Sequence, residues 1–185
     1  MNEQINKNFL DNFYKAEKLY KEKKLLESLE IYKVLLKENP NHVSVVNNIG
    51  LIYEKLKRFD ESVIFYEKCN KLLPNQAIII HNLANMYCRL ERYIDAFPLL
   101  KKIINTNLKS EANYEKYALC LFYTQSKEET KNFIESVLSK FPKNIVLNGL
   151  LGKSLLHLNL HREGLEYIKK CTGFIEFDDN GVKYI

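Results

Sequence analysis

Two asparagines whose side chains could hold a peptide backbone lie 34 residues apart, at Asn48 and Asn82. Each follows another polar residue, Asn47 in the first case and His81 in the second. An asparagine amide carries two N–H donors and one carbonyl acceptor, so two stacked amides could grip an extended segment without reading its sequence. The alternative is that both amides are solvated on a surface that binds nothing.

Residues arranged for catalysis or metal binding are scarce. No Gly-rich phosphate loop, nucleophile elbow or His-Glu metal motif appears. His157 and His161 are four apart, but residues 158–160 place them across a turn rather than on one helix, which argues against a two-histidine metal site. Cys69 and Cys171 are most simply packing residues. We therefore expect a protein that is not an enzyme and that uses no metal or cofactor.

Composition favours a soluble, all-α protein. Of 185 residues, 46% are hydrophobic and 28% charged, and six glycines, four prolines and no tryptophan leave little material for tight β-turns. The net charge of +5 is spread along the chain without an arginine cluster, which makes a nucleic-acid partner unlikely. No signal-like segment or membrane span is visible. We expect a cytoplasmic protein with reduced thiols and no membrane partner.

Small residues recur with a period of 34. Frames of that length give five repeats without an insertion, and these form one expected domain over residues 9–176 after a lead of residues 1–8. The frames are 9–42, 43–76, 77–110, 111–144 and 145–176. The eighth places hold Ala16, Gly50, Ala84, Ala118 and Gly152, and the twentieth places hold Ser28, Ser62, Ala96, Thr130 and Gly164. Two helices that cross closely need a short side chain on each at the contact.

Proline and aspartate mark the expected helix ends. Pro40, Pro74 and Pro142 share the thirty-second place of their frames, where proline cannot continue a helix. Asp60 and Asp95 lie near the starts of second helices, where a carboxylate can meet free amides and the positive end of the helix dipole. Each frame therefore reads as a helix-turn-helix hairpin that must stack on its neighbours to bury its apolar face.

The period and these residues resemble the tetratricopeptide repeat family over about residues 9–176. The resemblance implies a right-handed solenoid of antiparallel helix hairpins, whose concave side is lined by first helices and holds a peptide or protein segment. The third frame departs from the family pattern, because Leu108 replaces the proline and Pro98 lies early in the second helix, where it would delay the helix start or bend it. The fourth frame has a turn at residues 124–129 that contains no glycine.

The same resemblance implies which side chains line the concave groove. These candidates are Asn47, Asn48, His81, Asn82, Asn85, Arg89, Lys116, Tyr123 and Lys153. Asn48 and Asn82 look like two rungs of the asparagine ladder found in some peptide-binding members. The ladder is short, because the equivalent places in the other frames hold Tyr14, Lys116 and Leu150.

Charges along the expected groove bear on the kind of segment it could take. Other family members bind a terminal carboxylate with lysine, asparagine and arginine, but the corresponding first-frame places hold Phe13 and Glu17, which disfavours such a clamp. Arg89, Lys116 and Lys153 could still attract an acidic segment.

The C-terminal tail has the pattern of a β-hairpin that begins near residue 174, with residues 177–185 as its end. Its two β-prone runs, 174–177 and 182–185, flank an Asn-Gly pair, which is the strongest short hairpin signal. Such a hairpin could cap the fifth repeat, offer an edge for dimerisation or for a partner, or fray.

We expect a non-catalytic protein–protein interaction module or adaptor that binds a peptide or protein segment on its concave face. One alternative is a self-assembling structural scaffold, a homo-oligomer formed through end faces or the tail hairpin. Another is an accessory subunit or domain of a separate enzyme. In such a repeat only a few surface residues determine which ligand binds, so the sequence does not identify the partner.

Overall fold

The computed structural model describes residues 2–106, 110–172, 175–178 and 181–184, with side chains described for 7–106 and 110–171. The chain divides into two units, Met1–Arg92 and Tyr93–Ile185. The expected proline-free end of the third frame, at residue 108, lies outside the described residues. That all five frames form one domain stays a prediction, as does the handedness of the solenoid.

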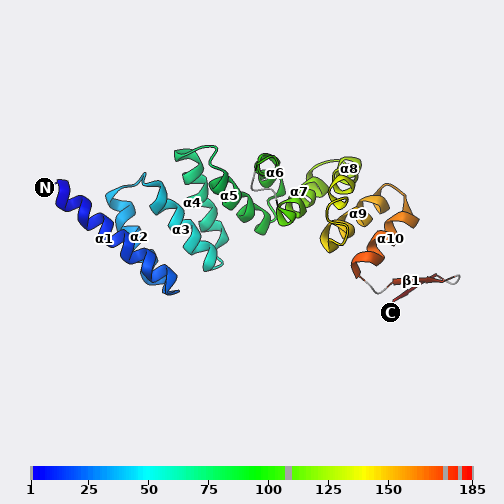
Figure 1. Ribbon diagram of the computed structural model, residues 1–185, viewed down its shortest axis with the longest axis horizontal. Helices are drawn as coiled ribbons and strands as arrows, with labels where there is room; N and C mark the ends of the chain where they lie inside the picture. Colours follow the sequence, from blue (N-terminus) through cyan, green and yellow to red (C-terminus); the bar gives the residue numbers. More distant parts are fainter. Residues whose placement is uncertain (1, 107–109, 173–174, 179–180, 185) are drawn as a thin grey trace. The chain divides into compact units, whose positions relative to one another are not determined.

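The first unit consists of helices joined by short turns (Figure 1). They are α1 (Asn2–Lys21), α2 (Leu25–Glu38), α3 (Val43–Lys55), α4 (Phe59–Leu72) and α5 (Ala77–Arg89). Consecutive helices pack on one another, so α1 with α2 and α3 with α4 are the hairpins that the 34-residue period predicts. The first helix begins at Asn2 and therefore includes residues that precede the first frame.

The helix ends of this unit are where proline and aspartate predict them. The helices α2 and α4 end at Glu38 and Leu72, two residues before Pro40 and Pro74. Asp60 lies in the first turn of α4, where its carboxylate faces the positive end of the helix dipole. Local sequence thus sets the lengths of these helices.

The two helices of each hairpin cross at the small residues. Ser28 Oγ donates a hydrogen bond to the Ala16 carbonyl at 2.8 Å, and Ser62 Oγ donates to the Gly50 carbonyl at 2.8 Å. Both serines are fully buried. A Cβ atom on Gly50 would lie 3.0 Å from the Tyr66 ring, so a side chain at this position would require a small movement of Tyr66. The close crossing expected from the eighth and twentieth places is confirmed in this unit.

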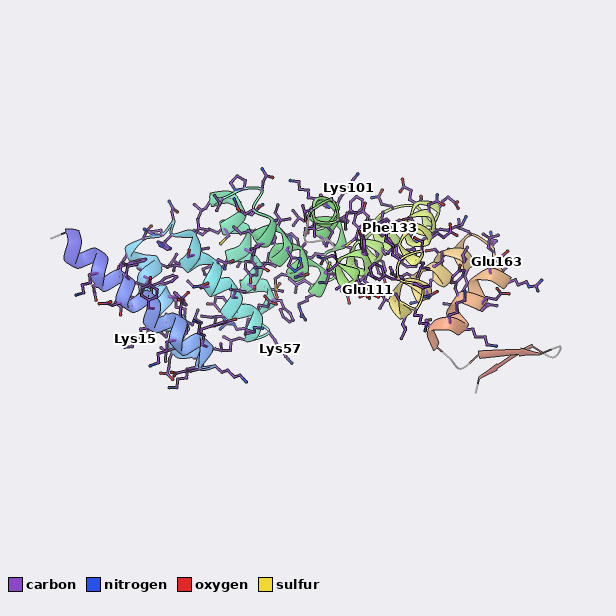
Figure 2. The ribbon with its side chains drawn as sticks, viewed as in Figure 1. Lys15, Lys57, Lys101, Glu111, Phe133 and Glu163 are labelled. Carbon is purple, nitrogen blue, oxygen red and sulfur yellow. The ribbon has the colours of Figure 1, made fainter. Side chains whose placement is uncertain are left out.

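The turn inside most hairpins uses a left-handed residue at the fifteenth place of the frame. This conformation places the Cβ of an L-residue close to the following carbonyl and costs free energy in any residue but glycine. Figure 2 labels one example, Lys57, between α3 and α4. The residues with this conformation are Lys23 (φ 62°), Lys57 (φ 60°), Glu91 (φ 57°) and Asn159 (φ 63°).

The second unit contains further helices and a short two-stranded sheet. They are α6 (Tyr93–Ile103), α7 (Glu111–Thr124), α8 (Lys127–Leu138), α9 (Ile145–His157), α10 (His161–Thr172), β1 (Ile175–Asp178) and β2 (Gly181–Tyr184). The strands pair antiparallel with Ile175 opposite Tyr184, at the place of the expected hairpin, and its turn at 179–180 lies outside the described residues. Whether this tail caps the repeats or pairs with another chain stays a prediction.

This unit contains two departures from the family pattern that the sequence shows, at Pro98 and at the turn of the fourth frame. The helix α6 begins at Tyr93, five residues before Pro98, so the expected delay of the helix start is wrong. In the fourth frame α8 begins at Lys127, which makes the turn shorter than the expected 124–129. Gln125 is extended there rather than left-handed, and the Ser126 side chain accepts a hydrogen bond from the Glu129 N–H. A serine cap thus replaces the left-handed turn.

Aromatic rings fill the space between α7 and α8. The ring of Phe133, labelled in Figure 2, meets that of Tyr117 edge to face with centroids 4.8 Å apart. Tyr117 also stacks on Phe97 of α6, with ring centroids 5.4 Å apart. Ala118, at the eighth place, is fully buried in this core, as the small-residue pattern predicts.

A close helix crossing in the second unit joins α9 and α10. A Cβ atom on Gly152 would lie 2.8 Å from the backbone carbonyl oxygen of Gly164, and one on Gly164 would lie 3.0 Å from the Gly152 carbonyl oxygen. Neither helix can therefore accept a side chain at this point without separating from the other.

Gly152→Ala should lower the free energy of unfolding by about 1–3 kcal/mol, because the new methyl overpacks a contact with backbone. Chemical denaturation of the full chain measures the change. Gly149→Ala is the matched control on the same helix, since its Cβ would meet only the Cys171 side chain, at 3.3 Å. If both substitutions have the same effect, the crossing is looser than described.

Candidate functional site

A hydrogen bond joins the first candidate asparagine to a buried tyrosine. Asn48, on α3, donates from Nδ2 to Tyr32 Oη on α2 at 2.8 Å. Tyr32 is only 1% exposed, so its ring is part of the core while its hydroxyl reaches the surface of α3. The α3 helix that carries Asn48 is capped by His42, whose Nδ1 accepts from the Val45 N–H at 3.3 Å.

A pocket of about 190 Å³ opens where these two side chains meet. Its walls come from three consecutive helices. It is lined by Glu17, Tyr20 and Lys21 of α1, Tyr32 of α2, and Asn48 and Leu51 of α3. Five of these residues, all but Tyr32, lie on the first helices α1 and α3, which the family resemblance assigns to the groove. The pocket therefore lies on the face where a ligand is expected.

The electrostatics of the pocket keep the tyrosine neutral. Burial raises the pKa of Tyr32 to about 12 from an ordinary value of 10.0, against the lowering effect of the Asn48 hydrogen bond. The negative charge of Glu17 also raises the pKa of Tyr32. Glu17 is half-buried and makes no ion pair with any residue that the structure describes.

Asn47, next to Asn48, has a different environment. Its side chain is half-buried, and its Oδ1 atom is buried without a hydrogen-bond partner in the described part of the chain. A buried carbonyl that accepts no hydrogen bond costs free energy, so this amide would gain from a donor supplied by a ligand or water.

The second asparagine does not repeat the contact of the first. Tyr66 is the equivalent of Tyr32 one frame later, but its hydroxyl donates to Glu54 Oε2 at 3.2 Å instead of meeting Asn82. Burial, together with the Glu54 charge, raises the pKa of Tyr66. Asn82 is half-buried and has no side-chain hydrogen bond to any described residue. The two rungs of the expected ladder are therefore not equivalent.

The other candidates on α5 are partly engaged with the protein itself. Asn85 Nδ2 lies 2.9 Å from His81 Nε2, one helical turn away. The Arg89 guanidinium carbon lies 5.3 Å from the centre of the Phe59 ring, in cation–π geometry, and the side chain is exposed. Arg89 is held against an aromatic face while its edge stays open to a ligand.

Three candidates belong to the second unit. Tyr123 is 61% exposed and stacks on Tyr93, with centroids 4.6 Å apart and planes 6° apart. Lys153 lines an open hollow of about 240 Å³ with Leu156 and His157. Lys116 is half-buried. The sequence candidates thus fall into six residues of the first unit and three of the second.

Phe122 connects the aromatic and basic candidates of the second unit. Its ring meets Tyr123 at 5.3 Å and His157 at 5.9 Å, both edge to face. Phe122 occupies a groove place of the family pattern but is 91% buried, which is why it supports neighbouring side chains more than it can contact a ligand.

Sequence reasoning missed the aromatic and apolar members of the pocket. Tyr20 and Leu51 lie on first helices but are not among the candidates expected from the sequence. Tyr32 belongs to a second helix, which the family pattern does not assign to the groove at all. The sequence does contain an indication of the role of Tyr32, because the next frame has a tyrosine, Tyr66, at the same place. A tyrosine in the core requires a polar partner for its hydroxyl.

Among the residues that the structure describes, no group of three or more His, Cys, Asp and Glu side chains could hold a metal ion. His157 ends α9 and His161 begins α10, so a turn separates them as the sequence indicates. Cys69 is buried, and burial raises its pKa to about 11, which makes it an unreactive packing residue. Within the described ranges, no helix is both long and apolar enough to cross a membrane.

Two models of the tetratricopeptide repeat match the chain directly. One matches residues 43–76 and the other residues 77–107. The boundary between them coincides with the boundary of the second and third frames. Comparison with curated proteins gives no match.

Solved structures of such repeat proteins superpose on most of the chain. YrrB, described as a TPR protein with an unusual peptide-binding site, is 17% identical with a TM-score of 0.78, over 88% of this chain and 84% of that chain. MamA AMB-1 is 17% identical with a TM-score of 0.78, over 91% and 92%. MamA from Desulfovibrio magneticus RS-1 is 16% identical with a TM-score of 0.74, over 89% and 93%. At these identities the likeness shows the fold alone.

The stability of the protein should fall as pH rises from about 10 to 12. A tyrosine whose pKa is higher in the folded state stabilises the fold fully below pH 10, and this contribution is lost as pH rises through the folded value, by about 1.4 kcal/mol per pH unit. Tyr32→Phe should flatten that decline, and at neutral pH it should cost about 1 kcal/mol through the lost Asn48 hydrogen bond. Denaturation series at several pH values measure both effects.

Asn48→Ala is the matched control for this pH dependence. It removes the same hydrogen bond but keeps the phenol, and the donated hydrogen bond lowers the pKa of Tyr32. The decline should therefore extend to higher pH in Asn48→Ala, opposite to the effect of Tyr32→Phe. Equal slopes in the two variants would show that Tyr32 does not titrate as described.

Proposed function

This chain belongs to the tetratricopeptide repeat family, and from that premise we propose that it is a non-catalytic interaction module. It binds an extended peptide or protein segment along the first helices of its hairpins, on the face that the family uses as its concave side. The adaptor role and the cytoplasmic location expected from the sequence are parts of the same proposal.

One observation carries this proposal: first helices and a buried tyrosine form a pocket on the expected binding face. The pocket exposes the Asn48 amide beside an apolar wall, which is the combination that orients a ligand while burying its surface. Its volume of about 190 Å³ is below the ~300 Å³ at which small-molecule sites begin, so it suits one side chain of a larger ligand.

Two further side chains on α5 are suited to hold such a segment. Asn82 keeps its donors and acceptor uncommitted to described residues, so it can pair with a peptide backbone. Arg89 rests on Phe59 and can offer a planar pair of N–H groups to a carboxylate of the segment. The peptide-binding site ascribed to YrrB, which shares this fold, supports a peptide as the ligand class.

The double substitution Asn82→Ala and Arg89→Glu should weaken capture of the native partner by about tenfold or more, because it removes a backbone contact and reverses a charge. The measurement is quantitative affinity capture from the source cell, with peptide mapping of the partner and titration of the mapped peptide. Lys71→Glu is the control, since it reverses one charge at an exposed place on the second helix α4.

Equal capture by the double variant and the wild-type chain would remove this face as the binding surface. Light scattering on the same samples tests the alternative partner, a second copy of this chain. A mass that depends on concentration, together with no other captured protein, would replace the proposed function with self-assembly.

A further inference from the structure

The pocket lined by α1, α2 and α3 contains a carboxylate that forms no ion pair with a described residue. Glu17 is half-buried there and forms no ion pair with a described residue, and the nearby Asn48 Oδ1 accepts no hydrogen bond from a described residue. A carboxylate partly removed from water is stabilised by a cation or by donors. The pocket is therefore incomplete in a way that a positively charged group would correct.

From this arrangement we propose that the pocket binds a basic side chain, lysine or arginine, of the bound segment, with Glu17 as its anionic partner. The inference rests on the proposed function, because the side chain belongs to the segment that lies along the first helices. The segment bound by the first unit must therefore carry a positively charged side chain at the position of this pocket.

The walls of the pocket fit the stem of such a side chain. Tyr20 and Leu51 line it together with the edge of Tyr32, and all three present carbon surface. Lysine and arginine bury their methylene chains along apolar surface while their charged ends reach polar groups. Aromatic rings also attract a cation placed over their faces. A short acidic side chain would find the same walls but would meet the like charge of Glu17.

The polar atoms of the pocket are mainly acceptors. The Glu17 carboxylate and Asn48 Oδ1 can each take an N–H from the ligand. Tyr32 Oη already accepts from Asn48 at 2.8 Å, which orients the amide so that its oxygen is available. Both lysine and arginine offer several N–H donors and no acceptor, so the ligand and the pocket are complementary.

Lys21 is the one lining group that opposes this occupant. It lies one helical turn after Glu17 on α1, is exposed, and makes no ion pair with a described residue. Its stem lines the pocket while its ammonium stays in water, so it weakens the local negative potential without closing the site. Removing its charge should therefore strengthen binding of a cation.

The test uses the full chain labelled with ¹⁵N and four capped tripeptides, acetyl-Gly-X-Gly-amide, with X as arginine, lysine, citrulline or glutamate. Citrulline has the length and shape of arginine without its charge. The arginine and lysine peptides should shift the backbone amide signals of Leu51 and the side-chain amide of Asn48. The citrulline peptide should bind at least about fivefold more weakly, and the glutamate peptide more weakly still.

Two substitutions give effects of opposite sign. Glu17→Gln should weaken binding of the arginine peptide at least about fivefold, and Lys21→Gln should strengthen it about twofold. Glu38→Gln, at the exposed end of α2, changes the net charge equally and should leave binding unchanged. Dispersed amide spectra of each variant establish that it is folded before the titration.

Equal binding of the arginine and citrulline peptides would overturn the proposal, as would unchanged binding in Glu17→Gln or tighter binding of the glutamate peptide. This failure is distinct from failure of the proposed function. If the arginine peptide leaves Asn48 unshifted while the Asn82→Ala and Arg89→Glu variant still loses its partner, the segment binds but its basic side chain does not enter this pocket.

Discussion

The close crossing of the two helices in the hairpins α1–α2, α3–α4 and α9–α10 is the constraint on which the rest of this structure depends. A Cβ on Gly50 would lie too close to the Tyr66 ring, and the Ser62 hydroxyl donates a hydrogen bond to the Gly50 carbonyl. The same short approach joins Gly152 to Gly164 in the second unit. A helix that packs this closely on its partner has little freedom to rotate, so the side chains on its remaining face are held in defined positions.

The candidate site depends on a buried tyrosine in the second helix of the hairpin. Tyr32 and Tyr66 fill the same place in the cores of successive hairpins, and both must find a partner for a buried hydroxyl. Tyr32 meets Asn48 of the next frame, whereas Tyr66 meets Glu54 of its own frame. The Tyr32 contact holds the Asn48 amide beside the pocket. The Tyr66 contact leaves Asn82 without a side-chain hydrogen bond to a described residue.

The candidate side chains therefore differ in what they can still offer a ligand. His81 and Asn85 lie within hydrogen-bonding distance of each other, and Arg89 rests on a ring, so the polar face of α5 is partly organised before any ligand arrives. Glu17, at the other end of the same unit, forms no ion pair with a described residue. A segment with a basic side chain at one end and an acidic group near Arg89 has the matching order of charges within this unit.

The sequence alone determined the helix hairpins, the helix ends before Pro40 and Pro74 and the close crossings, because these depend on steric and hydrogen-bonding properties of residues close together in the chain; it did not determine the start of α6 or the turn before α8. The 34-residue period, the small eighth and twentieth places and Pro40 and Pro74 all act within one hairpin. Only the tertiary structure decided the pocket, since Glu17, Tyr32 and Asn48 come from three helices and meet through packing. Residues at equivalent places of the repeat can have different hydrogen-bond partners, as Tyr32 and Tyr66 do. A periodic sequence does not specify which partner each residue has.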